Sequence, residues 1–435
     1  MIRQPARALR MIPLNENHIQ DVYELIRSNP GEPPLSFWAS LVSGPVIIAS
    51  LTSGFTFFGT ILLYRQLSQS EAGVLTLVLA LVQLGLMIGG LGQPTLMQRV
   101  YSYVPEGEFD WRQDLLRTSM LGIPATCLLG LLALVFYDLD PGWVLLVVLP
   151  VVAQIVVLTE SRLLNASRHY AWSSILMRLP NSLLILPALA LVALDLKNQL
   201  EVTLKAYTAA SLIIVFVGLL LLQHLLPCGR RIMSWKERRS GLVFIFTHSS
   251  YTLPEQGLLA FGGGMLVPSQ LAVYGSMAPL LKPFDLLTDV LRNIFTTELI
   301  YLRQQRMRRI VASLRLAGIA AALLAIAMGP LMINWLYSGR YDQGNRLIPW
   351  LAAAGLFRLL EVFPRSHIIG QGSQELLRRF VLWQIVSSAL LLAFGLALVM
   401  HSGVVAIAIT MAAIQVARYL ISDLFFHAEQ QESRD

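Results

Sequence analysis

Long apolar segments recur along almost the whole chain, and short polar stretches separate them. At a rise of about 1.5 Å per residue, each run is long enough to cross a hydrocarbon core about 30 Å thick. The pattern predicts twelve membrane-spanning helices, over residues 37–64, 73–98, 115–137, 143–164, 171–194, 203–226, 241–266, 271–300, 309–335, 347–371, 377–399 and 403–426. The loops between them are too short to hold a folded domain, so we expect an all-α polytopic membrane protein.

The basic residues give this protein an orientation, because loops rich in Lys and Arg stay in the cytoplasm. Of the 33 Lys and Arg residues, 23 fall on one side of the predicted membrane, five on the other and five inside the predicted spans. Both termini are therefore predicted to be cytoplasmic. The first 36 residues hold no apolar run of signal-peptide length, and their apolar residues have helical spacing, which predicts a cytoplasmic amphipathic segment.

A basic break divides the helices six and six. The short stretch Ser70–Leu75, which leads into the second helix, resembles Ser269–Tyr274, which leads into the eighth. An even number of crossings between them predicts two parallel six-helix repeats, related by a pseudo-two-fold axis along the membrane normal, with a substrate site at their interface. The predicted units are an N-terminal segment 1–36, a first bundle 37–227, a basic cytoplasmic linker 228–240, a second bundle 241–426 and a cytoplasmic tail 427–435.

The eighth apolar segment carries four charged residues, which follow one another at steps of three, four and three: Lys282, Asp285, Asp289 and Arg292. This spacing places them on one face of a helix. Charges at the bilayer centre are costly, so that face must meet protein or water and not lipid. Two interpretations stay open: a structural ion network between helices, or the lining of a hydrated path for an ionic substrate.

Two further groups of charges are candidates. The tenth segment carries Arg358, Glu361 and Arg365 on one face, which indicates either an internal Arg-Glu-Arg network or a second part of the polar lining. Arg65 ends the first segment on the outer side, as a substrate contact or as an interfacial residue whose charge extends to water.

Composition narrows the function classes. The chain is 55% hydrophobic and 14% charged, with a mean hydropathy of +0.61, so it belongs in a bilayer. Its formal charge of +7 is spread over loops and forms no block for nucleic acid. The two cysteines give no disulfide framework, no His or Cys cluster has metal spacing, and no phosphate-binding nucleotide loop is present. We expect no cofactor and no metal.

Several motifs, in order along the chain, resemble those of the O-antigen and exopolysaccharide flippases, within the superfamily of polysaccharide flippases, lipid II flippases and MATE exporters. They are the turn Leu63–Gly73, the loop Tyr103–Glu106, the Ala272–Gly275 stretch, the segment Ile333–Tyr341, and Gly370–Gly372 with Leu376–Arg379. The chain departs from the family pattern at Gln66–Ser68, at Ala72 and in its long N-terminal segment. The resemblance implies two six-helix bundles, arranged as a V around a central cavity that opens alternately to the two sides.

The function implied is that of a flippase and not of an enzyme. It would move an undecaprenyl-pyrophosphate-linked oligosaccharide repeat unit from the inner to the outer leaflet of a bacterial inner membrane, for lipopolysaccharide O-antigen or exopolysaccharide synthesis. Two alternatives stay open: a MATE-type cation-coupled exporter of small molecules, and a membrane glycan polymerase or ligase, which the short outer loops disfavour. Partners would be the lipid-linked glycan, membrane lipid, and a polymerase or chain-length protein.

Each candidate has an expected role. Arginine holds a pyrophosphate well, because its planar fork offers paired donors and stays charged when buried. The candidate residues for binding the pyrophosphate or sugar are Lys282, Arg292, Arg65, Arg358 and Arg365. A carboxylate in such a cavity can exchange a proton or accept Na⁺. Asp285 and Asp289 are therefore the candidates for coupling to H⁺ or Na⁺.

Overall fold

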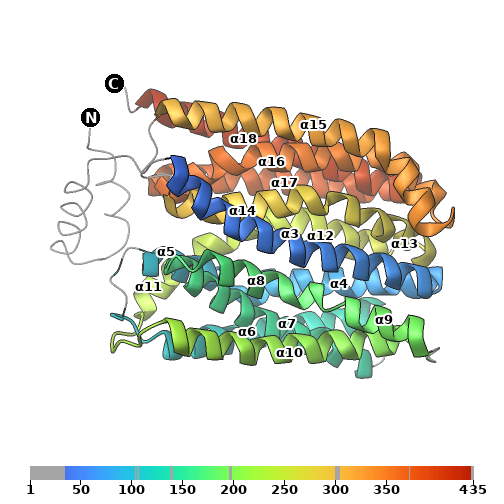
Figure 1. The fold of residues 1–435 in the computed structure, drawn as a ribbon, viewed down its shortest axis with the longest axis horizontal. Helices are drawn as coiled ribbons and strands as arrows, with labels where there is room; N and C mark the ends of the chain where they lie inside the picture. Colours follow the sequence, from blue (N-terminus) through green and yellow to red (C-terminus); the bar gives the residue numbers. More distant parts are fainter. Residues whose placement is uncertain are drawn as a thin grey trace.

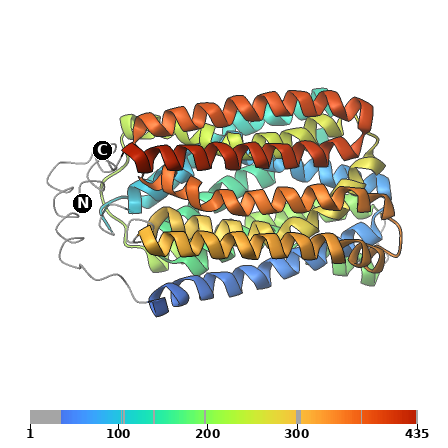
Figure 2. The same ribbon diagram turned by 90° about the horizontal axis from the view of Figure 1, so that it is seen from above.

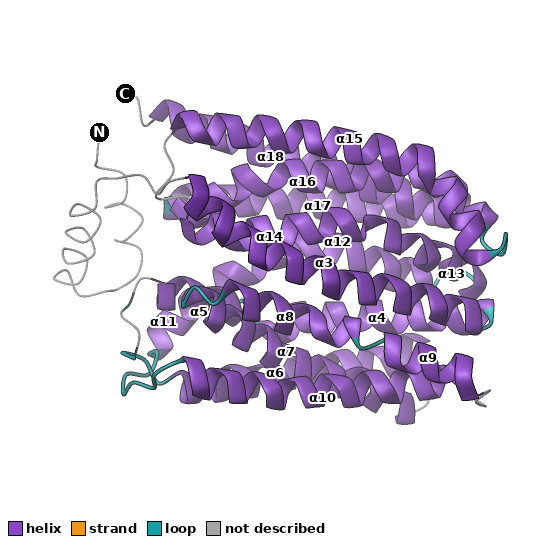
Figure 3. Cartoon of the chain, viewed as in Figure 1, coloured by secondary structure: helices purple, strands orange, loops and turns teal. Residues whose placement is uncertain are grey.

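The computed structural model describes residues 35–102, 104, 107–137, 141–194, 198–298, 304–371 and 373–432. The predicted amphipathic segment 1–36, apart from its last two residues, lies outside this range, as does the end of the predicted tail, residues 433–435. Within the described residues the protein is built of helices and loops (Figure 3), with one isolated bridge, between Phe109 and Arg231.

The helices of the first half are α3 (Leu35–Gln66), α4 (Gln69–Gly90), α5 (Gln93–Ser102), α6 (Trp111–Tyr137), α7 (Pro141–Ala166), α8 (Tyr170–Ser182), α9 (Ile185–Leu194) and α10 (Gln199–Leu225). A short helix, α11 (Trp235–Ser240), follows in the linker. The second half contains α12 (Leu242–Gly263), α13 (Pro268–Met277), η1 (Ala278–Leu281), α14 (Lys282–Glu298), α15 (Gln304–Tyr337), η3 (Asp342–Leu347), α16 (Ile348–Gln371), α17 (Gln374–Ser402) and α18 (Val404–Glu432).

The long helices run back and forth along one common axis (Figures 1 and 2). Helices α6, α7, α9 and α10 form the lower part of Figure 1, α15 to α18 form the upper part, and α3, α4 and α12 to α14 lie between them. The start of α3 and the end of α18 lie at the same end of the molecule. The basic residues predict that this end faces the cytoplasm, so it is called the cytoplasmic end below, and the opposite end is called the outer end.

The expectation of an all-α polytopic membrane protein is confirmed. Eight segments of the described chain are long and apolar enough to cross a membrane, judged by length and composition. Helix α14 is not among them, because it is only 17 residues long and carries charged residues along its whole length. The predicted segments correspond to twelve passes when α4 with α5, α8 with α9, and α13 with η1 and α14 each count as one.

Three of the predicted continuous helices are interrupted, each for a local reason. Between α4 and α5, Leu91 and Gly92 have positive φ angles of 46° and 67°, which ends the helix in a left-handed turn. The α8–α9 pass breaks near Leu183 and Leu184, where Pro187 has no N–H to offer the Leu183 carbonyl. Likewise, Pro283 cannot bond the carbonyl of Pro279, and a 3₁₀ turn replaces the α-helix there.

Buried apolar residues form two large clusters stacked along the membrane axis. The outer cluster includes Leu281, Leu351 and Leu258, and the inner cluster includes Leu291, Leu359 and Phe244. Each cluster combines residues of both halves of the chain. Five charged residues lie in sequence between members of the two clusters: Glu255 of α12, Lys282, Asp285 and Asp289 of α14, and Arg358 of α16. Arg292, Glu361 and Arg365 lie among residues of the inner cluster.

Helix α4 of the first half approaches the backbone of the second half unusually closely, at two glycines. A methyl group on Gly73 of α4 would lie 1.8 Å from the Pro268 carbonyl oxygen of α13, and one on Gly92 would lie 2.3 Å from the Gly241 oxygen beside α12. These positions must be glycine for the helices to approach so closely. Helix α4 is therefore fixed against α12 and α13 at both of its ends.

The linker between the halves is attached to the first half. Arg238 of α11 forms a buried ion pair with Asp114 of α6, with Nη2 2.5 Å from Oδ1, and Arg231 pairs with Glu108 at 2.6 Å. A capping box between Ser234 and Glu237 starts α11. The basic linker is thus a folded clamp at the cytoplasmic end.

Candidate functional site

The four charged residues predicted to share one helix face all lie on α14, and their contacts divide them into two groups. Lys282 and Asp285 interact with the second half of the chain. Asp289 and Arg292, one turn further along, meet the first half. Helix α14 therefore carries both an internal ion network and a polar contact between the halves.

The first group is a network inside the second half. Asp285 of α14 and Glu255 of α12 both form ion pairs with Arg358 of α16. Lys282 lies 3.9 Å from Asp285, and Gln415 of α18 donates a hydrogen bond to Glu255. Two carboxylates meet two cations, so this network is neutral and ties four helices together.

The second group crosses between the halves. Asp289 receives hydrogen bonds from Arg292 of its own helix at 2.6 Å and from Arg178 of α8 at 3.3 Å. Arg178 also donates to the Ser53 hydroxyl of α3 at 3.0 Å and to the Leu286 carbonyl at 3.4 Å. Three helices, α3, α8 and α14, thus meet around one arginine–aspartate pair.

A third arginine adds to this charge. Arg162 of α7 donates to the Gln98 side chain at 2.9 Å and lies within electrostatic range of Arg292 and Asp289. We call Arg162, Arg178, Asp289 and Arg292 the Asp289 cluster. Among the described residues of this cluster, three arginines lie near one aspartate.

Exposure distinguishes the Asp289 cluster from a sealed ion network. The side chains of Arg178, Asp289 and Arg292 keep 13%, 24% and 18% of their surface accessible. By contrast, Glu361 and Arg418, which pair at 3.1 Å inside the second half, keep 2% and 0%. A water-sized molecule reaches the Asp289 cluster, whereas the Glu361 network is dry.

The candidates on the tenth predicted segment lie in networks. Arg365 pairs with Glu361 at 3.1 Å, and Arg418 of α18 completes that group. Arg358 turns the other way, toward Asp285 and Glu255. Both arginines are buried, at 6% exposure for Arg365 and 8% for Arg358. This arrangement corresponds to the internal-network interpretation of the segment.

Arg65 lies far from the Asp289 cluster. It is exposed at the outer end of α3, twelve residues beyond Ser53 and so about 18 Å further along the helix. Its backbone carbonyl, with those of Tyr64 and Leu67, receives hydrogen bonds from Arg340 of the α15–η3 loop. Arg340 thereby caps the end of α3 from the other half of the molecule.

Three motifs of the family resemblance meet at this outer end: Leu63–Gly73, Ala272–Gly275 and Ile333–Tyr341. Arg340 and Tyr341 contact the turn after α3, where a capping box between Ser68 and Glu71 starts α4. Tyr337 donates to the Ser276 carbonyl at 3.1 Å, and Gly275 leaves room for the Tyr64 hydroxyl. In this structure the described residues of these motifs build a joint between the halves and not the charged cluster.

Sequence reasoning missed two members of the cluster, Arg162 and Arg178, because both were counted with the cytoplasmic loops. Arg178 instead lies eight residues after the start of α8 at Tyr170, about 12 Å into the helix. Its position between Leu176 and Leu179, inside an apolar run, was the available signal.

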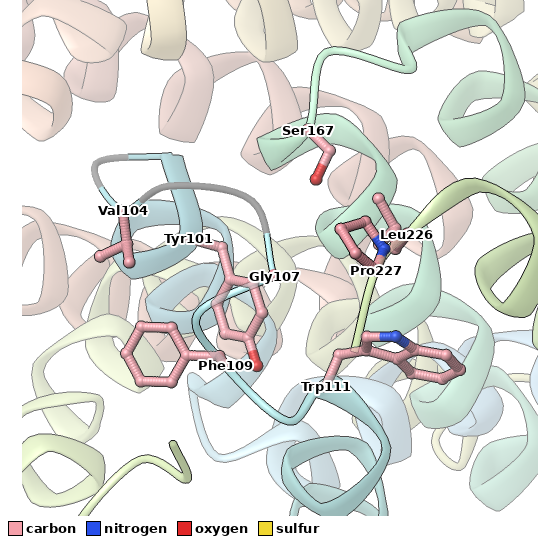
Figure 4. A pocket seen from close by; sticks show the side chains of 8 residues that line it. All are labelled: Tyr101, Val104, Gly107, Phe109, Trp111, Ser167, Leu226 and Pro227. Atoms are coloured by element: carbon pink, nitrogen blue, oxygen red, sulfur yellow. The ribbon is translucent and has the colours of Figure 1, made fainter. Parts of the chain in front are cut away.

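A small pocket lies at the cytoplasmic end, where the basic linker joins the first half (Figure 4). It lies between the loop before α6 and the end of α10, lined by Tyr101, Phe109, Trp111 and Pro227 among others. Its volume of about 20 Å³ is enough for one water molecule and too small for a ligand.

Comparison with known proteins identifies the fold. No family model and no curated protein matches the sequence. Among solved structures, the MATE multidrug transporter DinF-BH in complex with rhodamine 6G is similar at a TM-score of 0.62 and 15% identity, over 89% of this chain and 94% of that one. A MATE in complex with MaL6 gives 0.58 and 12%, over 90% and 96%. An inward-facing MATE family transporter of the MOP superfamily gives 0.50 and 12%, over 89% and 99%. The chain has the MATE-like polytopic fold.

Proposed function

We propose that this multi-pass membrane protein, with its MATE-like fold, is a flippase for a lipid-linked oligosaccharide. The substrate is a glycan on a polyprenyl pyrophosphate, of the undecaprenyl type in a bacterial inner membrane, and it passes from the inner to the outer leaflet. Its place is in O-antigen or exopolysaccharide synthesis, with a polymerase or chain-length protein as the next partner.

The observation that supports this proposal is the Asp289 cluster. A pyrophosphate diester carries two negative charges, and this cluster brings three guanidinium groups, those of Arg162, Arg178 and Arg292, around Asp289. Guanidinium groups from both halves of the molecule converge there, and such groups bind phosphate oxygens through paired hydrogen bonds. A substrate bound between the halves is what alternating access requires.

The other candidate residues take supporting roles in this proposal. Lys282, at 37% exposure, is the further cation on α14 that a sugar or phosphate can reach. Arg358 and Arg365 hold the second half together, and Arg65 marks the outer end of the path. Asp285 and Asp289 remain proposed sites of coupling to H⁺ or Na⁺.

The second candidate function is export of cationic small molecules. The observation in its favour is that the similar solved structures are MATE multidrug transporters, one of them holding rhodamine 6G. A cation would have to approach the guanidinium groups of Arg178 and Arg292, which repel it.

The test is binding to the purified full chain in nanodiscs. The probe is farnesyl-diphosphoryl-N-acetylglucosamine, a short diphosphate diester, and rhodamine 6G is the competing ligand. We expect the diester to bind, and Arg178→Gln to weaken it at least about tenfold, since a hydrogen bond to a charged group contributes about 1.5–3 kcal/mol. Arg65→Gln is the matched control and should leave affinity unchanged. Binding of rhodamine 6G without binding of the diester would favour the exporter instead.

A further inference from the structure

Glu160 of α7 is a buried carboxyl group that lacks a partner within the described part of the chain. Its exposure is 0%, and neither carboxyl oxygen has a hydrogen-bond partner there. The other buried acidic residues contrast with it, because each lies beside a basic side chain. These are Asp114, Glu237, Glu255 and Glu361. Glu160 therefore needs its own explanation.

The carboxyl group packs directly against the backbone of α10. A methyl group on Gly218 would lie 2.0 Å from Glu160 Oε2, so the missing side chain at Gly218 makes the space that the carboxyl group fills. The contact lies inside the first half, at α10, on the edge of the molecule away from α12 to α18 (Figure 1). It is thus separate from the Asp289 cluster.

Among the described residues, the helices packed against α7 bring no counter-charge to this position. Helix α4 carries only Glu71, at its outer end. On α6, Arg117 lies at a similar depth to Glu160 but its side chain is exposed, and no charge follows it. On α10, Lys205 and Glu201 pair with each other near the outer end, and His224 is exposed at the cytoplasmic end.

The charged side chains of the remaining neighbours have other positions. Arg99 is the charged residue of α5, and Arg178 of α8 binds Asp289. On α7 itself, Arg162 turns to Gln98.

An ionised carboxylate in these surroundings would be unstable. Burial of a charge without a cation or hydrogen bonds costs several kcal/mol, and the bilayer interior offers no water to reduce this. The packing around Glu160 and Gly218 is therefore that of the neutral acid. We infer that Glu160 is a proton-binding site, and that its occupancy sets the position of α7.

Helix geometry connects this site to the Asp289 cluster. Residues two apart on a helix project about 200° apart, so Glu160 faces α10 while Arg162 faces the opposite side, toward Arg292 and Asp289. Loss of the proton forces the carboxylate to gain water, which separates α7 from α10 at Gly218. The same displacement moves Arg162. The inference rests on the proposed function, in which Arg162 binds the pyrophosphate.

Thermodynamic linkage between proton binding and diester binding predicts how the diester affinity changes with pH. The neutral form holds Arg162 where it lies here, so diester affinity should fall as pH rises and Glu160 loses its proton. One linked proton gives a slope of up to about tenfold in affinity per pH unit. Glu160→Gln keeps the neutral shape and cannot titrate, so the affinity of this variant should fall less steeply with pH than that of the wild type.

The experiment measures binding of farnesyl-diphosphoryl-N-acetylglucosamine to the full chain in nanodiscs, from acidic to mildly alkaline pH. This probe is a diester, so its own charge stays constant. Glu201→Gln, which removes an exposed carboxylate on α10, is the control and should keep the wild-type slope. Equal slopes in the wild type and Glu160→Gln would overturn the inference and leave the proposed function standing. Absence of diester binding to the wild type would instead contradict the proposed function.

A second measurement needs no variant. Dicyclohexylcarbodiimide reacts with protonated carboxyl groups in apolar surroundings, and peptide mass spectrometry locates the product. We expect modification at Glu160, decreasing as pH rises, and none at the ion-paired Glu361. An unmodified Glu160 at acidic pH would overturn the inference even if Glu160→Gln failed to fold.

Discussion

Acidic residues in the membrane helices of this protein have different roles, which depend on the partners that surround each one. Glu361 and Glu160 are both acidic and fully enclosed, at 1% and 0% exposure, yet one has two arginines and the other has no partner among the described residues. Asp289 resembles neither, because it is partly accessible and shared between helices. A charge in the sequence of a membrane helix therefore predicts an inward-facing residue but not its role.

The Glu361 network gives a stability prediction. Glu361→Gln would leave Arg365 and Arg418 buried without this counter-charge, which should lower the free energy of unfolding by about 3–5 kcal/mol. Thermal unfolding of the detergent-purified protein measures this.

A matched control exists on the surface. Glu375 pairs with Arg379 at 2.5 Å, but the two side chains are 74% and 69% exposed. Glu375→Gln should therefore leave the unfolding temperature unchanged. Equal effects of the two substitutions would contradict a structural role for the Glu361 network.

Helices in this protein are positioned by small residues as much as by charges. Helix α4 is almost entirely apolar, and its sequence alone gives no reason to select a partner. Gly73 and Gly92 determine which segments α4 packs against, because only a residue without a side chain lets the chain lie against Pro268 and Gly241. The close contact of α4 with α12 and α13 therefore depends on these two glycines.

This packing predicts the effect of one methyl group. In Gly73→Ala the added carbon would overlap the Pro268 carbonyl, which cannot rotate away because it belongs to the backbone. We expect a loss of about 1–3 kcal/mol in stability, typical of overpacking. Gly54→Ala on α3, which meets nothing within 4 Å, should be neutral or slightly stabilising. Thermal unfolding of both variants tests the difference.

At the scale of the whole molecule, two of the polar contacts between the halves lie at different depths. Arg178 and Asp289 join them in the cytoplasmic part, and Arg340 joins the outer end of α3. With both contacts formed, the structure corresponds to a state that is closed at these points. In the alternating access that we propose, one contact breaks while the other holds.

The outer contact can be removed selectively. Arg340→Ala deletes the hydrogen bonds to the Leu67, Arg65 and Tyr64 carbonyls, so the outer ends should separate. Spin labels at Ser70→Cys and Gln343→Cys, with Cys127 and Cys228 replaced, should report a longer or broader distance. Arg346→Ala, on the same outer loop, should leave the distance unchanged. An unaltered distance in Arg340→Ala would show that this contact does not hold the halves together.

The sequence by itself determined the class of this protein. Twelve apolar runs and the placement of basic loops follow from the cost of exposing backbone and charge to lipid, which acts on every residue independently of its neighbours in space. The same cost predicted that Lys282, Asp285, Asp289 and Arg292 turn inward.

Only the tertiary structure decided which partners these residues meet. Asp285 and Asp289 are four residues apart on one face, yet one pairs within its own half and the other with Arg178 across the interface. Ion pairs depend on helices distant in sequence, and spacing along one helix contains no information about them. The isolation of Glu160 among the described residues was equally invisible, because it is a property of all the surrounding helices together.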